Sequence, residues 1–239
     1  MADLLATSGD IYSISVAGQM NAAIHHPSWY QAVRLITEEE LEVAQSQRGA
    51  TPARDHILGD FGPDDVVCTP VYTQFTTTTF RVVCTNENWT ISAYQAEALE
   101  RIREICSRVF EILPHTPVGS FSCNFFHHRP TLLSEVGDQL ASFLKDLPIG
   151  VTVPAKGAAA SLRYRFSSEM RLLDLTIEAS VRSPSMVFVG IVATHPIKAQ
   201  GFFELRPLLE KNLAEDRAEA TKVLGDIVTA LNSTGGNHA

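Results

Sequence analysis

The chain of 239 residues has four cysteines, and no two of them form a Cys-x-x-Cys pair. A structural zinc site usually needs closely spaced thiolates, so this spacing gives no support to one. All four lie within apolar segments, at Cys68, Cys84, Cys106 and Cys123. We therefore expect reduced thiols in the hydrophobic core, and not a framework of disulfide bonds.

The sequence also lacks the short glycine motifs by which many enzymes are recognised. Neither Gly-x-Gly-x-x-Gly nor Gly-x-x-x-x-Gly-Lys-Ser/Thr is present, although these are the common loops that hold phosphate groups. The Gly-x-Ser-x-Gly turn that presents a nucleophilic serine is absent as well. The sequence therefore favours a non-enzymatic protein without a cofactor, although it does not decide the point.

Positive charge and long apolar runs are both scarce. The net charge is -8 with a pI near 5.5, and no run of Lys and Arg occurs. Because nucleic acids and anionic membranes attract basic surfaces, neither partner is expected. The sequence contains no run of about 18 apolar residues, the length that a membrane-spanning helix needs. The first residues lack the pattern of a secretory signal. We expect a cytoplasmic protein.

The clearest pattern in the chain runs from Thr78 to Pro130 and begins with a hairpin. β-branched and aromatic residues fill 78–85 and 88–93, which is typical of strands. Asn86-Glu87 separates the two runs and fits a two-residue turn. The segment therefore predicts two adjacent antiparallel strands.

A helix over 94–113 and a third strand over 117–128 complete this pattern. Ser92 and Gln95 have the spacing of a capping box that would open the helix, and Pro114 would end it. Apolar residues recur every three or four positions, which places them on one stripe of a helix. They are Leu99, Ile102, Ile105, Cys106, Val109, Phe110 and Leu113.

Two further amphipathic helices are predicted, over 131–147 and 207–232. Strand patterns surround them, so the predicted fold class is α+β. We expect a mostly antiparallel sheet, or sheets, with the three main helices packed on one side.

The predicted domain organisation is a single α+β domain over 1–232, followed by a flexible tail over 233–239. A stretch rich in glycine, proline and alanine, 149–160, is the best candidate for an internal boundary. It leaves open the alternative of two small α+β subdomains.

Residues 161–179 carry the clearest strand signal, because apolar and polar residues alternate in two successive runs. If Ser168-Glu169 forms a two-residue turn, Arg163 lies opposite Asp174, and apolar residues also face one another. The segment therefore predicts a hairpin. Further strands are predicted at 10–18 and at 186–193, the second one central in a sheet because both of its faces are apolar.

The stretch from Trp29 to Ile36 fits either a strand or the start of a helix. We expect a strand there, followed by a short helix over 38–47. Thr37 and Glu40 have capping-box spacing and would open that helix.

Candidate ligand-binding residues fall in two places. His56, Asp64 and Asp65 lie in 46–65, a stretch whose composition predicts a loop of a length that is usually functional or mobile. The other candidates bracket the strand at 117–128, and they are His115, Asn124, His127, His128 and Arg129.

No metal is expected at these histidines. His127 and His128 are neighbours on a predicted strand, so their side chains point to opposite faces and cannot hold one ion together. Hydrogen-bonded structural histidines and a solvated loop are the simpler interpretations of both groups.

The leading functional hypothesis is a non-enzymatic interaction or assembly protein that forms a homo-oligomer, with another protein partner left open. Strands with two apolar faces and three amphipathic helices provide more apolar surface than one layer readily hides. The alternative is a metal- or small-ligand-dependent enzyme or binder. It would use the 46–65 loop together with the strand ends at His115 and His127–Arg129.

Overall fold

The computed structural model describes residues 10–41, 66–145, 161–197 and 202–235. Its strands pair antiparallel, and its three longest helices have 14, 10 and 34 residues. The predicted α+β class with a mostly antiparallel sheet and three main helices is confirmed. No helix in the described ranges is long and apolar enough to cross a membrane.

The chain forms two compact units, each built from two separate stretches. Unit 1 is Met1–Cys123 with Thr194–Asn212, and unit 2 is Asn124–Ala193 with Leu213–Ala239. Three elements supply residues to both units: β6 (Val118–Pro130), β9 (Met186–Pro196) and α6 (Phe202–Gly235). The single domain over 1–232 stays a prediction, and 149–160 lies outside the described residues.

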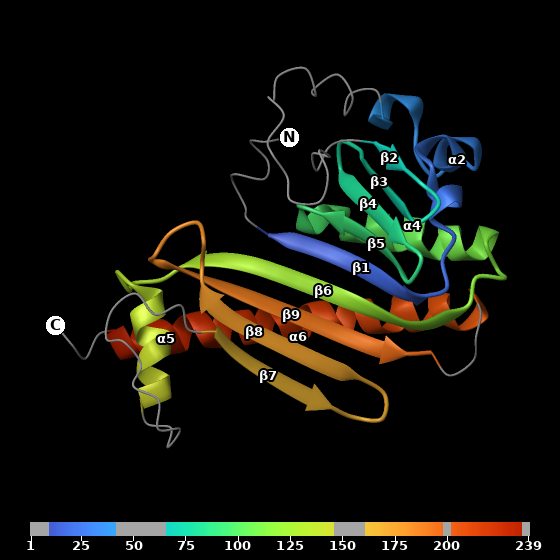
Figure 1. Cartoon of the computed structure of the whole chain (residues 1–239). Helices are drawn as coiled ribbons and strands as arrows, with labels where there is room; N and C mark the ends of the chain where they lie inside the picture. Colours follow the sequence, from blue (N-terminus) through green and yellow to red (C-terminus); the bar gives the residue numbers. More distant parts are fainter. Residues whose placement is uncertain (1–9, 42–65, 146–160, 198–201, 236–239) are drawn as a thin grey trace. The chain divides into compact units, whose positions relative to one another are not determined.

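In unit 1 the strands follow the order β2-β3-β4-β5-β1-β6 (Figure 1). Their bounds are β1 Ile11–Gly18, β2 Val67–Cys68, β3 Tyr72–Thr76, β4 Phe80–Thr85 and β5 Asn88–Ala93. Cys84 pairs with Trp89 across β4 and β5, which leaves Asn86-Glu87 as the turn. The predicted hairpin is confirmed.

Helix α4 (Leu99–Ile112) packs against β1 and β5 with the predicted apolar stripe. Six of the seven predicted residues are buried: Leu99, Ile102, Ile105, Cys106, Val109 and Phe110. The predicted capping box is wrong. Ser92 remains in β5, and a short 3-10 helix, η3 (Ala96–Ala98), precedes α4 with Gln95 as an N-cap that makes no side-chain capping bond.

The strand predicted between Trp29 and Ile36 is also wrong. The chain forms α2 (Pro27–Ala32) there, and the short 3-10 helix η1 (Ala22–His25) precedes it. Pro27 suits the first helical position, and the His26 Nδ1 atom accepts the N–H of Ser28 at 3.2 Å, so local capping decided what the apolar pattern left ambiguous.

The second capping box is confirmed. The Thr37 N–H donates to Glu40 Oε2 at 2.8 Å, and the Glu40 N–H donates to Thr37 Oγ1 at 3.1 Å. Residues 38–41 are helical, and the rest of the predicted helix over 38–47 lies outside the described residues.

A buried hydrogen-bond chain lies in the core of unit 1. Trp89 Nε1 donates to the Tyr30 hydroxyl at 2.8 Å, and that hydroxyl lies 2.9 Å from His25 Nδ1. Tyr30 and Trp89 are fully buried and His25 is 2% exposed. Burial lowers the pKa of His25 from 6.5 to about 4, because the imidazolium form loses its hydration.

Strands β1 and β6 approach closely at Gly18. The Gln19 N–H donates to the Pro117 carbonyl oxygen at 2.9 Å. A Cβ atom on Gly18 would overlap that same oxygen, whereas a Cβ on Gly119 would meet only the Ala17 oxygen, at 3.9 Å. Gly18 is therefore required for this strand pairing.

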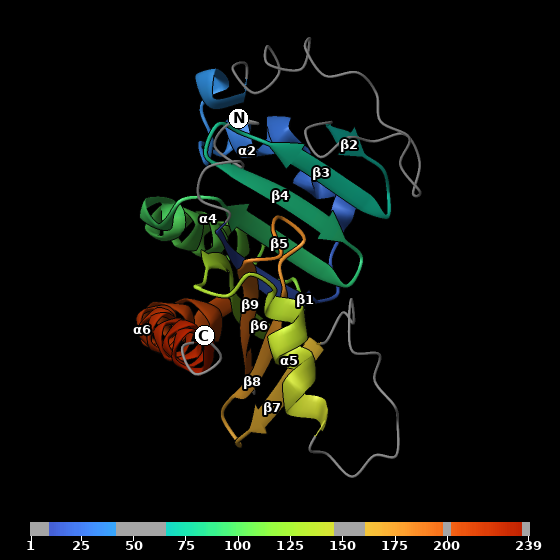
Figure 2. The ribbon, with the colours of Figure 1, turned by 90° about the vertical axis from the view of Figure 1, so that its left-hand side faces the viewer.

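In unit 2 the strands follow the order β6-β9-β8-β7, with β7 at Ser161–Ser167 and β8 at Leu172–Ala179. The predicted central strand is thus β9. Figures 1 and 2 show α6 running along one face of β8 and β9. Helix α5 (Val136–Lys145), which contacts β8, begins at Val136 and not at the predicted 131, and positions 146 and 147 lie outside the described residues. Helix α6 is longer than the predicted 207–232.

The predicted register of the β7–β8 hairpin is shifted by two residues. Arg165, not Arg163, lies opposite Asp174. The turn has four residues, closed by the Ser168 N–H donating to the Arg171 carbonyl at 2.8 Å. Because the shift is even, every side chain keeps its predicted face of the sheet.

The four cysteines are free thiols, but only three of them are buried. Burial raises the pKa of Cys84 to about 12 and raises that of Cys106 further. Cys68 is exposed, which corrects the prediction that it lies in the core. It is one of only two residues of the short strand β2, so little of the sheet covers it.

Candidate functional site

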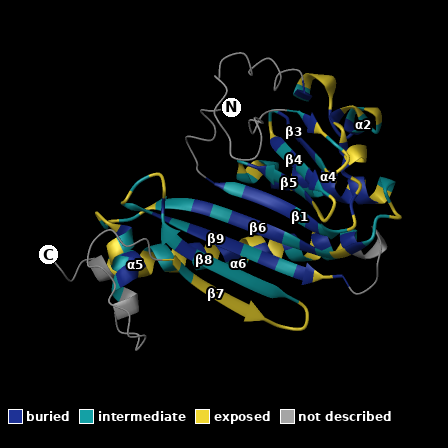
Figure 3. Ribbon diagram, in the orientation of Figure 1, coloured by how far each residue is buried: buried dark blue, intermediate teal, exposed yellow. Residues whose placement is uncertain are grey.

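Strand β7 ends the strand order of unit 2 and is the most exposed strand described (Figure 3). Six of its seven residues are exposed, and the seventh, Leu162, is half-buried. Tyr164 is 49% exposed and Phe166 is 56% exposed, a large fraction for aromatic side chains in a strand. We call Ser161–Ser167 the β7 edge.

The charges on the β7 edge are balanced by β8. Arg165 binds Asp174 through two contacts, Nε to Oδ1 at 2.6 Å and Nη2 to Oδ2 at 3.2 Å, and this partner raises the pKa of the guanidinium. Arg163 Nη2 lies 3.7 Å from Glu178 Oε1. The basic stripe on β7 therefore carries little net charge, and it is better suited to pairing across strands than to binding an anion.

The sequence of the β7 edge is nearly symmetric about Tyr164. It reads Ser-Leu-Arg-Tyr-Arg-Phe-Ser from 161 to 167, so each residue has a counterpart of the same kind on the other side of the tyrosine. Two antiparallel copies centred on Tyr164 would place Leu162 opposite Phe166 and serine opposite serine. Such a strand is complementary to itself in one antiparallel register.

A polar cluster lies on β6 in unit 2. Arg129 Nη2 donates to His127 Nδ1 at 3.4 Å, and Arg129 Nη1 donates to the His128 carbonyl at 3.1 Å. His128 Nδ1 lies 2.7 Å from the Ser180 hydroxyl oxygen. Asn124 lies on the same strand and is buried, at 7% exposed.

The cluster has the features of a structural tie. His127 is 5% exposed and Ser180 is 7% exposed, so a substrate would not reach them in this conformation. Ser180 also accepts the Arg182 N–H at 3.1 Å within the turn that follows β8. His127 and His128 are neighbours on β6, and the described residues contain no group of three ligands that could hold a metal.

The remaining sequence candidates do not join this cluster. His115 is exposed in the turn between α4 and β6 and belongs to unit 1. His56, Asp64 and Asp65 lie outside the described residues, as does most of the long loop predicted at 46–65. Of the eight candidates, the structure shows direct contacts among His127, His128 and Arg129.

Sequence reasoning missed an ion cluster between the β7–β8 turn and α6. Arg171 contacts two carboxylates, with Nη2 3.0 Å from Asp216 Oδ1 and Nη1 bonded to Glu219 Oε2. The distance between Arg171 Nη2 and Asp216 Oδ1 is that of an ion pair, but the two groups are not aligned for a hydrogen bond. Asp216 is 1% exposed, and its place between Leu213 and Ala220 on the apolar stripe of α6 is the signal that could have revealed it.

Comparison of the chain with models of known protein families, with curated proteins and with solved structures gives no match.

Proposed function

We propose that this protein is a non-enzymatic, cytoplasmic interaction protein that forms a homodimer by antiparallel pairing of the β7 edge. The observation that carries the proposal is that the most exposed described strand is also self-complementary about Tyr164. An exposed sheet edge offers unpaired backbone groups, and a second copy of the same strand satisfies them. Isologous pairing of this kind is the commonest form of protein symmetry.

The side chains of β7 favour a second copy of the same strand as the partner at this edge. In the centred register the two Tyr164 rings meet on the two-fold axis, and Leu162 packs on the Phe166 of the second copy. Arg163 faces the second Arg165, but each guanidinium already has a carboxylate partner on β8. The repulsion between the arginines is therefore reduced, while the aromatic and aliphatic side chains lose contact with water.

The first test is the mass of the native protein at micromolar concentration, with elemental analysis of the same sample. The proposal expects a metal-free dimer. A monomer that retains a stoichiometric metal would instead support the alternative function, a metal-dependent enzyme or binder. That alternative would use the strand ends at His115 and His127–Arg129 together with the stretch 46–65.

Tyr164→Lys is expected to raise the dimer dissociation constant about tenfold or more, because it replaces a central aromatic pair with two like charges. Sedimentation over a concentration series measures the constant. Met170→Lys is the matched control, since Met170 is 60% exposed but lies in the turn beyond β7. Equal weakening by both variants would argue that the interface is elsewhere.

The register can be tested by disulfide cross-linking in a Cys68→Ser background, which removes the exposed natural thiol. Opposed Cβ atoms in an antiparallel pair lie about 4.5–5.5 Å apart, near the range of a disulfide. Tyr164→Cys should cross-link to itself. Leu162→Cys and Phe166→Cys should each cross-link poorly alone and readily when mixed. Efficient self-cross-linking at 162 would contradict the centred register.

A further inference from the structure

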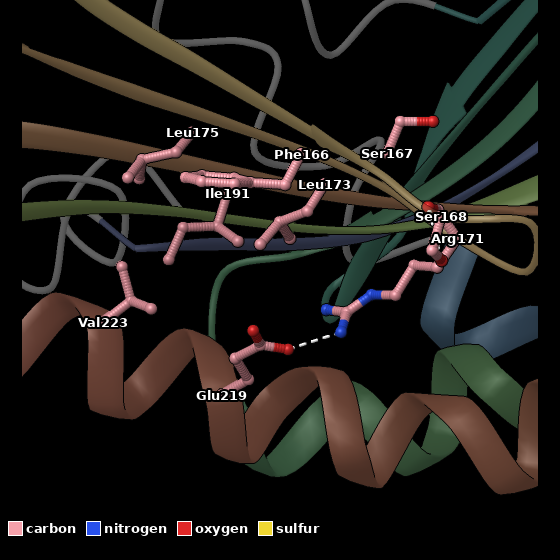
Figure 4. A pocket seen from close by; sticks show the side chains of 9 residues that line it. All are labelled: Phe166, Ser167, Ser168, Arg171, Leu173, Leu175, Ile191, Glu219 and Val223. Carbon is pink, nitrogen blue, oxygen red and sulfur yellow. Dashed lines mark hydrogen bonds and ion pairs between the residues drawn. The ribbon is translucent and has the colours of Figure 1, made fainter.

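A cavity of about 490 Å³ lies in unit 2 between the β7–β8 hairpin, β9 and α6 (Figure 4). Small-molecule sites in proteins commonly have volumes of this order. The apolar wall of the cavity is formed by Phe166, Leu173, Leu175, Ile191 and Val223. Figure 4 shows the side chains of the strands on one side of the cavity and those of α6 on the other.

The apolar layer between β8 and α6 is incompletely filled at this end. Leu173, Leu175 and Ile177 alternate along β8 and so point to the same face of the sheet. Ile177 is 8% exposed, whereas the two leucines, which line the cavity, are only half-buried. Val223 on α6 is half-buried as well, and Phe166, opposite Leu173 in the hairpin, is 56% exposed. An apolar molecule in the cavity would therefore remove further hydrocarbon surface from water.

The other end of the cavity is polar but carries no net charge. Ser167, Ser168, Arg171 and Glu219 line it. Arg171 Nη1 donates to Glu219 Oε2, and these two are the only charged residues among those that line the cavity. The Glu219 side chain is 42% exposed, and its carboxylate has lone pairs beyond the one that Arg171 uses. This end therefore offers hydrogen bonds without an unpaired charge.

A neutral head group suits this polar end better than a charged one. An ammonium or a carboxylate would lose hydration and meet a guanidinium and a carboxylate that already neutralise one another. A hydroxyl group loses less on leaving water, and it both donates and accepts hydrogen bonds. It can donate to the Glu219 carboxylate and accept from the Ser167 hydroxyl.

We infer that this cavity binds a neutral amphipathic molecule with a hydroxyl head, of which an aliphatic alcohol is the simplest form. The hydrocarbon chain lies against the apolar wall, and the hydroxyl group lies at Ser167 and Glu219. All of the lining residues belong to unit 2 of one protomer. The site therefore goes beyond dimer formation and does not depend on it.

The first test is a chain-length series of butanol, hexanol and octanol, measured by isothermal titration of the full-length protein. Each buried methylene should tighten binding about threefold to fourfold, so successive members should differ about tenfold. The octanol titration is repeated on Tyr164→Lys, which should bind within about twofold of the wild-type protein. A failure of the dimer proposal and a failure of this one thus remain distinguishable.

The head group is tested with octylamine and octanoate, which have the same chain length as octanol. Both should bind about tenfold more weakly than octanol. Glu219→Gln removes the lining carboxylate that neutralises Arg171, so octanoate should gain about threefold or more relative to octanol. Glu215→Gln is the matched control, exposed one turn earlier on α6 and outside the cavity lining, and it should keep the wild-type order.

The position of the chain is tested by changing the volume of the cavity. Val223→Phe should weaken octanol about tenfold or more by filling the cavity. Leu132→Phe is the matched control, because Leu132 is 84% exposed and outside the lining. Leu175→Ala makes the opposite change, and it should raise the affinity for decanol relative to octanol.

Four results would overturn the inference. One is an affinity that does not rise with the length of the alcohol. Another is octylamine or octanoate binding to the wild-type protein as tightly as octanol. The third is the absence of octanol binding up to millimolar concentration. The last is unchanged alcohol binding in both Val223→Phe and Leu175→Ala, which would place the alcohol outside the cavity.

Discussion

Gly18→Ala is expected to lower the free energy of unfolding by about 3 kcal/mol or more, because a methyl group there overlaps the backbone oxygen of Pro117. A backbone carbonyl cannot rotate away as a side chain can. Strands β1 and β6 would have to separate, at the expense of the 2.9 Å bond from the Gln19 N–H to the same oxygen. Urea denaturation of the purified proteins measures the change.

Gly119→Ala is the matched control for this prediction. Gly119 lies on β6, beside β1, but a Cβ there meets only the Ala17 oxygen at the ordinary contact distance of 3.9 Å. We expect its free energy of unfolding to change by less than about 1 kcal/mol. If both variants lost similar stability, the cause would be a general intolerance of this strand pair and not the overlap at Gly18.

Acid is expected to destabilise the protein through His25. Its pKa is about 4 when folded against 6.5 as the ordinary value, so between these pH values the unfolded chain binds a proton that the folded chain does not. The stabilisation is complete above pH 6.5 and is lost as the pH falls toward 4. At about 1.4 kcal/mol per pKa unit, the loss is about 3 kcal/mol.

The hydrogen bonds around His25 also predict that acid destabilises the folded protein. Trp89 Nε1 can only donate, so the Tyr30 oxygen accepts from it, and the Tyr30 hydroxyl donates its hydrogen to His25 Nδ1 in the neutral tautomer whose Nδ1 carries no hydrogen. A neutral imidazole accepts that hydrogen, whereas an imidazolium would present a competing N–H. Protonation therefore breaks the buried chain as well as placing a charge in the core.

Denaturation curves between pH 7 and pH 4 test this prediction. His25→Gln should lose about 3 kcal/mol less than the wild-type protein over this range, whatever its stability at pH 7. His115→Gln removes an exposed imidazole and leaves His25 in place, so it should follow the wild-type curve. Parallel curves for wild type and His25→Gln would refute the role of His25.

Local patterns in the sequence predicted the parts of the fold that depend on local interactions. The β4–β5 hairpin was predictable because two strand runs stand on either side of a two-residue turn. The turn of the β7–β8 hairpin was not, since strand alternation fits registers that differ by two residues equally well. At 29–36, a proline and a capping histidine outweighed the β-prone aromatic residues.

The candidate site was less predictable because its contacts join distant residues. Arg171 and Asp216 are 45 positions apart, and only the packing of α6 beside the β7–β8 turn brings them together. The symmetry of residues 161–167 was visible in the sequence, but its meaning depends on β7 being the last strand in the order. His127, His128 and Arg129 are consecutive on β6, and their role in binding a ligand stays a prediction.

The division of each unit into two stretches has a consequence for synthesis on the ribosome. Unit 1 ends at Cys123 in its first stretch and is completed only by Thr194–Asn212. At about 5–20 residues per second, translation of the intervening segment takes roughly 4 to 14 s. For that time the nascent unit 1 lacks its last stretch, including Leu205 and Leu209, which are fully buried in the finished protein. The growing chain therefore exposes apolar surface that chaperones of nascent chains would recognise.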